Sequence, residues 1–127
     1  MISPDLRAYL ECALWSSTTE DGEPLDREHG PEDFAPEAIA QAQRELAAFQ
    51  EAAGADHQEA ADLLARPGRY GGGESVAHDF WLTRTRCGAG FWDGDLPKDL
   101  GRRLTALAHA AGERWPYVGD DGLIYFA

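Results

Sequence analysis

The chain has 127 residues and a formal net charge of −12, and 43% of its residues are hydrophobic. This length is typical of one domain with one core, and the apolar fraction is too high for a disordered chain. The acidic surplus argues against direct binding to nucleic acid or to an anionic membrane, because phosphate groups repel it. We therefore expect a single domain over residues 1–127 whose partner carries positive charge.

The net charge is confined to the first half of the sequence. Residues 1–65 hold 15 acidic residues and three arginines, whereas residues 66–127 hold eight residues of each sign. Seven of the acids lie in one polar stretch rich in turn-forming residues: Glu20, Asp21, Glu23, Asp26, Glu28, Glu32 and Asp33. The stretch predicts a long acidic loop, and a loop of this length inside a compact domain is usually functional or disordered.

The N-terminal sequence lacks the features of a secretory signal, because Asp5, Arg7 and Glu11 interrupt its apolar residues. The sequence contains no run of about 18 apolar residues, the length that would predict a membrane span. The two cysteines, Cys12 and Cys87, share no metal-binding or redox motif, which favours reduced thiols. We expect a cytoplasmic protein without a metal or other cofactor.

Apolar residues at helical spacing predict that the first part of the chain, about residues 1–66, is helical. Ser3 and Pro4 are typical of a helix start, and the repeat that follows predicts a helix over 4–15. A second helix is expected from about 36 to 53, with Gly54 ending it, and a short third helix to about 64.

After Ser75 the pattern changes to alternation and predicts a β-hairpin over residues 78–92, with "CGAG" as its turn. A helix near 97–111 follows, and Asp121-Gly122 between two β-prone runs predicts a closing hairpin. The expected fold class is α+β. N-terminal helices pack with a β-hairpin–helix–β-hairpin part over about 75–127, whose hairpins form a small antiparallel sheet.

Three stretches resemble a family of small acidic proteins encoded by bacteriophages and prophages of GC-rich bacteria. They are "AHDFWLTRTRCGAGFWDG", "YVGDDGLIYF" and "ALWSSTTEDGEPLD", which together extend over most of the chain. The family has no established activity, so the resemblance implies a phage accessory protein in the host cytoplasm and carries over no catalytic residue. Arg86 and Cys87 stand where the family has more variable polar residues, which argues against essential chemistry at that turn.

Two sites are conceivable around the expected hairpin. His78, Asp79 and Asp93 could approach each other if the strands paired, but their spacing matches no metal-ligand motif, and strand-end and helix-capping roles are more common. Phe80, Arg84 and Arg86 could share an exposed face and bind single-stranded nucleic acid. The net charge of −12 disfavours that function, and the Phe80-Trp81 pair is more typical of a core.

The function favoured by the sequence is a non-enzymatic interaction protein. Its acidic stretch would bind a basic surface of a host protein, as a nucleic-acid mimic that inhibits a host or defence factor. A small metal- or ligand-binding enzyme domain at residues 78–95 and a single-stranded nucleic-acid-binding module are the alternatives. A stretch that serves solubility alone is an equally simple interpretation of the acids.

Overall fold

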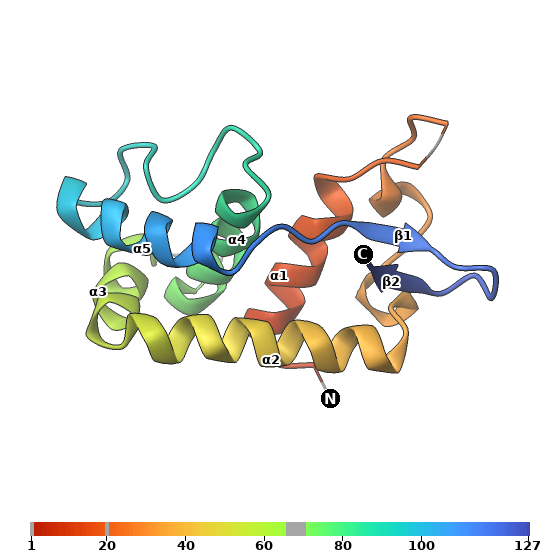
Figure 1. The fold of residues 1–127 in the computed structure, drawn as a ribbon, viewed down its shortest axis with the longest axis horizontal. Coiled ribbons are helices and arrows are strands. Elements are labelled where there is room, and N and C mark those ends of the chain that lie inside the picture. The colour runs from red at the N-terminus through yellow and green to blue at the C-terminus, as the bar shows by residue number, and fades with distance from the viewer. Residues whose placement is uncertain (1, 20, 66–70) are drawn as a thin grey trace.

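A computed structural model describes residues 2–19, 21–65 and 71–127. Helices α1 and α4 lie at the centre, α2 runs along one side of them, and a β-hairpin closes the end opposite α3 and α5 (Figure 1). The helices and strands are α1 (Pro4–Trp15), α2 (Pro36–Ala53), α3 (Ala55–Leu64), α4 (Gly72–Arg84), α5 (Lys98–Ala110), β1 (Pro116–Val118) and β2 (Ile124–Phe126).

The α+β class is confirmed, and so are the first three expected helices. The hydroxyl of Ser3 accepts a hydrogen bond from the Leu6 N–H at 3.2 Å and caps α1. Gly54 adopts a positive φ of 53° between α2 and α3, as the glycine at that position led us to expect. Among the described residues, no helix combines the length and apolar composition that crossing a bilayer requires.

The expected hairpin over residues 78–92 is wrong, because residues 72–84 form helix α4 and residues 87–97 form an irregular turn. Helix α4 packs against α1, α3 and α5, so side chains on most of its circumference are buried. A helix buried nearly all round shows no amphipathic repeat. The alternating sequence pattern was misleading because it counts Arg84 as a solvent-facing strand residue. In the structure the Arg84 side chain is 0% exposed.

The Phe80-Trp81 pair lies in the core, as expected for two adjacent large aromatic residues. Both residues are 0% exposed, whereas neighbouring residues of the predicted strand would have pointed to opposite faces of a sheet. Phe80 stacks on Phe49 of α2 with ring centroids 4.2 Å apart, and Tyr9 of α1 packs edge-on against Trp81. Leu104 of α5 and Ile124 of β2 are also fully buried, whereas Leu107 is only partly buried.

The C-terminal hairpin is confirmed. Strands β1 and β2 pair antiparallel with Tyr117 opposite Tyr125, and Gly122 has a φ of 82° in the turn between them. The Ala35 N–H donates to the Ile124 carbonyl at 2.9 Å, which attaches the hairpin to the residues before α2. The described part of the chain therefore contains a two-stranded sheet in place of the larger sheet expected from two hairpins.

Arg84 is the centre of a buried polar network that connects four helices. Its guanidinium donates to the Glu45 carboxylate at 2.7 Å and to the Tyr9 hydroxyl at 2.9 Å. It also donates to the carbonyls of Gly112 and Ala111 at 2.7 and 2.9 Å, so it caps the C-terminal end of α5. These bonds satisfy a charge that would otherwise be costly to bury.

The ionisation of Glu45 should make the fold sensitive to acid. Burial raises the pKa of its carboxyl, but the hydrogen bond and charge of Arg84, with help from Gln41 and Arg114, outweigh burial and lower that pKa below its ordinary value. A lowered pKa in the folded state stabilises the protein above the unfolded-state pKa, about 4.3 for glutamate, and the stabilisation is lost as pH falls through the folded-state pKa.

We therefore expect the free energy of unfolding of wild-type protein to exceed that of Glu45→Gln by more at pH 7 than at pH 3. Urea denaturation of both proteins at the two pH values measures the difference. An equal difference at pH 7 and pH 3 would contradict the role assigned to this carboxylate.

Candidate binding site at the acidic end of the molecule

The acidic stretch between α1 and α2 is anchored to the core at three points. Leu25, Pro31 and Phe34 are buried, and short 3₁₀ helices, η1 (Leu25–Arg27) and η2 (Pro31–Asp33), contain the first two. The Phe34 ring stacks on Phe126 of β2 at 5.2 Å. The expected long loop thus contains two short helical turns, and its apolar residues hold the polar ones at the surface.

The structure holds most of the predicted partner-binding acids in solvent. Asp21, Glu23, Asp26, Glu28 and Glu32 are exposed, whereas Asp33 is partly buried and Glu20 lies outside the described residues. The Asp33 carboxylate accepts a hydrogen bond from the Gly30 N–H at 2.8 Å, so it has a structural role. Arg27 forms an ion pair with Glu23 and offsets part of the local charge.

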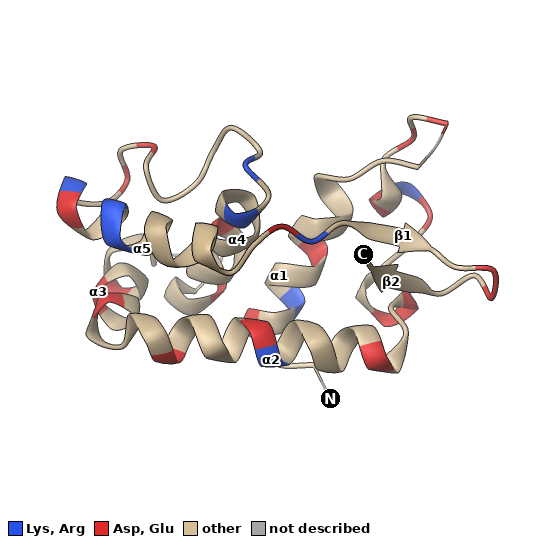
Figure 2. Ribbon diagram, in the orientation of Figure 1, with Lys and Arg blue, Asp and Glu red and all other residues tan. Residues whose placement is uncertain are grey.

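The hairpin adds two acids to this end of the molecule, Asp120 and Asp121, in the turn between β1 and β2 (Figure 2). Asp21, Leu25, Tyr117 and Val118 line one surface depression, which shows that the acidic stretch and β1 lie side by side. The C-terminal half was expected to be electrically neutral as a whole, so the sequence did not indicate this contribution. We call the exposed acids of residues 21–32, with Asp120 and Asp121, the acidic end.

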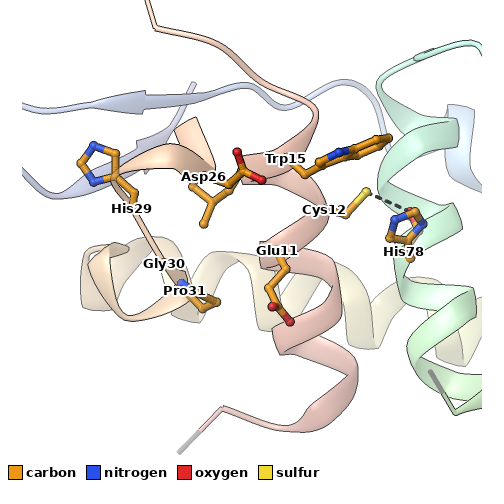
Figure 3. A pocket seen from close by; sticks show the side chains of 9 residues that line it. Glu11, Cys12, Trp15, Asp26, His29, Gly30, Pro31 and His78 are labelled. Carbon is orange, nitrogen blue, oxygen red and sulfur yellow. Dashed lines mark hydrogen bonds between the residues drawn. The ribbon is translucent and has the colours of Figure 1, made fainter. Parts of the chain in front are cut away.

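A pocket of about 470 Å³ opens between α1, the acidic stretch and α4 (Figure 3). Its lining residues come from all three segments: Glu11, Cys12, Leu14, Trp15, Asp26, His29, Gly30, Pro31 and His78. The indole of Trp15 is unusually accessible for its size, with 61% of the residue exposed. Its ring lies 6.2 Å from the His78 ring, centroid to centroid, so the two form one aromatic wall.

The pocket combines negative charge with an aromatic surface. Among the described residues, neither Glu11 nor Asp26 has an ion-pair partner. The Cys12 thiol donates to the His78 carbonyl at 3.6 Å, and burial raises its pKa well above the ordinary value, so it is not a reactive thiolate. Carboxylates beside an indole face provide a site for an ammonium or guanidinium group.

No family model, curated protein or solved structure matches the chain. Within residues 2–19, 21–65 and 71–127, no three His, Cys, Asp or Glu side chains gather as metal ligands.

The alternative ligand residues do not form one site. His78 and Asp79 are neighbours on α4, with His78 Nδ1 3.6 Å from Asp79 Oδ1. Asp93 lies in the turn after α4 and accepts a hydrogen bond from the Gly90 N–H at 3.4 Å, instead of sitting on a strand paired with His78. Arg84 is buried and Arg86 is exposed, so they do not share a face.

Glu11 and Trp15 are the site residues that the sequence analysis missed. They are four residues apart in α1 and therefore lie on the same side of the helix. Trp15 also falls outside the apolar repeat of that helix, which could have marked it as a surface aromatic. The sequence contained no indication that Asp26 and His78 would complete the pocket.

Proposed function

We propose that the chain is a non-enzymatic interaction protein whose acidic end binds a basic surface of a partner protein. The observation that carries the proposal is the pocket beside α1, which Glu11, Asp26 and Trp15 all line and where the two carboxylates lack a cationic partner among the described residues. A lysine or arginine side chain of the partner enters this pocket, while the surrounding acids contact neighbouring cations.

Charge and shape contribute differently to such an interface. Exposed carboxylates on the acidic end accelerate the encounter with a cationic surface and make its rate depend on salt. A cation held against Trp15 and the two pocket carboxylates is partly desolvated, so it contributes more to the lifetime of the complex. The anchoring of Leu25 and Phe34 reduces the entropy that the acidic stretch loses on binding.

The resemblance to the phage family supports a host protein as the partner. Basic protein surfaces commonly bind nucleic acid, and carboxylates spaced along a fixed backbone can occupy the positions of phosphates. The protein therefore acts as an acidic nucleic-acid mimic that inhibits a host or defence factor. Direct binding of nucleic acid is disfavoured, because Phe80 and Arg84, two of the three residues considered for it, are buried, and Arg86 alone is exposed among the three.

Neutralising the exposed acids of residues 21–32 should weaken binding to a cationic peptide. In one variant, Asp21, Glu23, Asp26, Glu28 and Glu32 are replaced by Asn or Gln. The probe is a fluorescently labelled peptide of eight arginines, and anisotropy and stopped-flow mixing give its Kd and association rate. We expect the Kd to rise at least about tenfold and the salt dependence of the association rate to fall, with little change in stability.

A matched variant separates location from net charge. It replaces five exposed acids elsewhere, Glu51, Glu59, Asp62, Asp95 and Glu113, by Gln or Asn, and so removes the same charge. We expect it to retain most of the affinity, while Glu11→Gln combined with Trp15→Ala loses affinity despite removing one charge only. Equal weakening in the two five-residue variants would show that the acids act through net charge alone and would refute the proposed interface.

A further inference from the structure

A second pocket lies away from the acidic end, between α5 and the turn that follows α4. Its volume is about 510 Å³. Phe91 and Leu96 are buried beneath it, and the Trp92 side chain, on a residue that is 45% exposed, forms one wall. Most of this lining is apolar, unlike that of the pocket beside α1.

The geometry of this second pocket is set by close packing between the turn and α5. A Cβ atom at Gly101 would overlap the Phe91 carbonyl oxygen, so only glycine allows the turn to approach the helix so closely. The Phe91 N–H donates to the Thr83 hydroxyl at 3.2 Å, and the Phe91 ring stacks on Phe49 at 5.8 Å. Phe91 therefore holds the turn in place, while the neighbouring Trp92 remains available at the surface.

Positive charge lies at one side of the pocket. Lys98 and Arg102 line it from the first turns of α5, where Figure 2 shows Lys and Arg residues. Helix α5 begins after Pro97 without a side-chain cap, so its N-terminal N–H groups add to the positive potential. Asp99 lies 3.5 Å from Arg102, but both side chains are largely exposed and such pairs are weak.

Thr105 lines the same pocket one turn beyond Gly101 and Arg102. Within the part of the chain that the structure describes, its buried hydroxyl has no hydrogen-bond partner. This oxygen has almost no solvent-accessible surface, so it is not a contact for a molecule in the pocket, and the lining cations carry the argument.

We infer that this pocket binds a small organic anion with a flat apolar body, of the aromatic carboxylate class. The ring packs against Trp92 and the apolar floor, and the carboxylate lies near Lys98 and Arg102. The rest of the molecule is strongly acidic, but charges on the acidic end are screened beyond a Debye length of about 8 Å at physiological ionic strength. Asp93 and Asp95 are exposed in the same turn, but the charged side chains that line the pocket are Lys98 and Arg102, and they favour an anion there.

The inference is tested with naphthalene-2-carboxylate and, as a neutral molecule of the same shape, naphthalene-2-carboxamide. Indole N–H signals of the four tryptophans are followed by ¹H–¹⁵N correlation spectroscopy and assigned by single Trp→Phe variants. We expect saturable shifts of the Trp92 signal with the carboxylate, smaller effects at Trp15 and Trp115, and binding of the carboxamide about tenfold weaker.

Variants locate the charge that the carboxylate contacts. Lys98→Gln with Arg102→Gln should weaken carboxylate binding about tenfold and leave carboxamide binding unchanged. Arg7→Gln with Arg44→Gln removes the same charge from exposed positions elsewhere and should have little effect. Equal affinities for the two compounds, equal weakening by the two pairs of substitutions, or the absence of a saturable Trp92 shift would overturn the inference.

Discussion

Replacing Arg84 by Met should lower the free energy of unfolding by about 3–5 kcal/mol, the range expected when one partner of a buried ion pair is removed. The substitution leaves the carbonyls of Ala111 and Gly112 and the Tyr9 hydroxyl without the donor that they have in the native structure. It also removes one of the two arginines that contact Glu45. Urea denaturation followed by circular dichroism measures the change.

Two further substitutions test why Arg84 is needed. Arg84→Lys retains the charge but cannot donate in the four directions of a guanidinium, so a large part of the destabilisation should persist. Arg86→Met, two positions along and exposed, should change the free energy of unfolding by less than about 0.5 kcal/mol. An Arg84→Met protein with the same free energy of unfolding as the wild type would mean that the buried network contributes little to stability.

Truncating Trp81 to Ala should cost about 3–5 kcal/mol, because the removed indole leaves a cavity in the centre of the core. Trp81 is 0% exposed, contacts Tyr9 and Phe126, and donates from Nε1 to the Ser16 hydroxyl at 2.8 Å. Thermal and urea unfolding of the variant should both show the loss.

Trp115→Ala is the matched control, since Trp115 is 43% exposed and its truncation leaves no comparable cavity. We expect a change below about 1 kcal/mol for this variant. Trp81→Phe should fall between the two, because it keeps an aromatic ring but loses the hydrogen bond to Ser16. Equal unfolding free energies for the Trp81→Ala and wild-type proteins would show that the indole is not a core side chain.

The candidate site shows how far charge patterning extends without a structure. The acids of residues 21–32 were visible as a group because they are neighbours in the sequence, and the structure places them in solvent. The position of Asp26 in one pocket with Glu11, Trp15 and His78 depends on the packing of α1 against α4. The two segments are separated by the whole length of α2 and α3, so no local pattern could reveal that contact.

Elements governed by near neighbours in the chain were predictable from local patterns. The hydroxyl of Ser3 caps α1, Gly54 ends α2, and Asp121-Gly122 forms the turn between β1 and β2, each through contacts or backbone angles within a few residues. Periodicity also located α2 and α5, because each buries one face only.

Tertiary packing determines which side chains of helix α4 are buried. It is surrounded by α1, α3 and α5, so its polar and apolar residues do not separate into an outer and an inner face. Arg84 is buried there because Glu45, 39 positions away in the sequence, and the end of α5 satisfy its charge and donors. Whether a charged side chain is buried depends on partners that are distant in sequence, and that information arises only when the chain is folded.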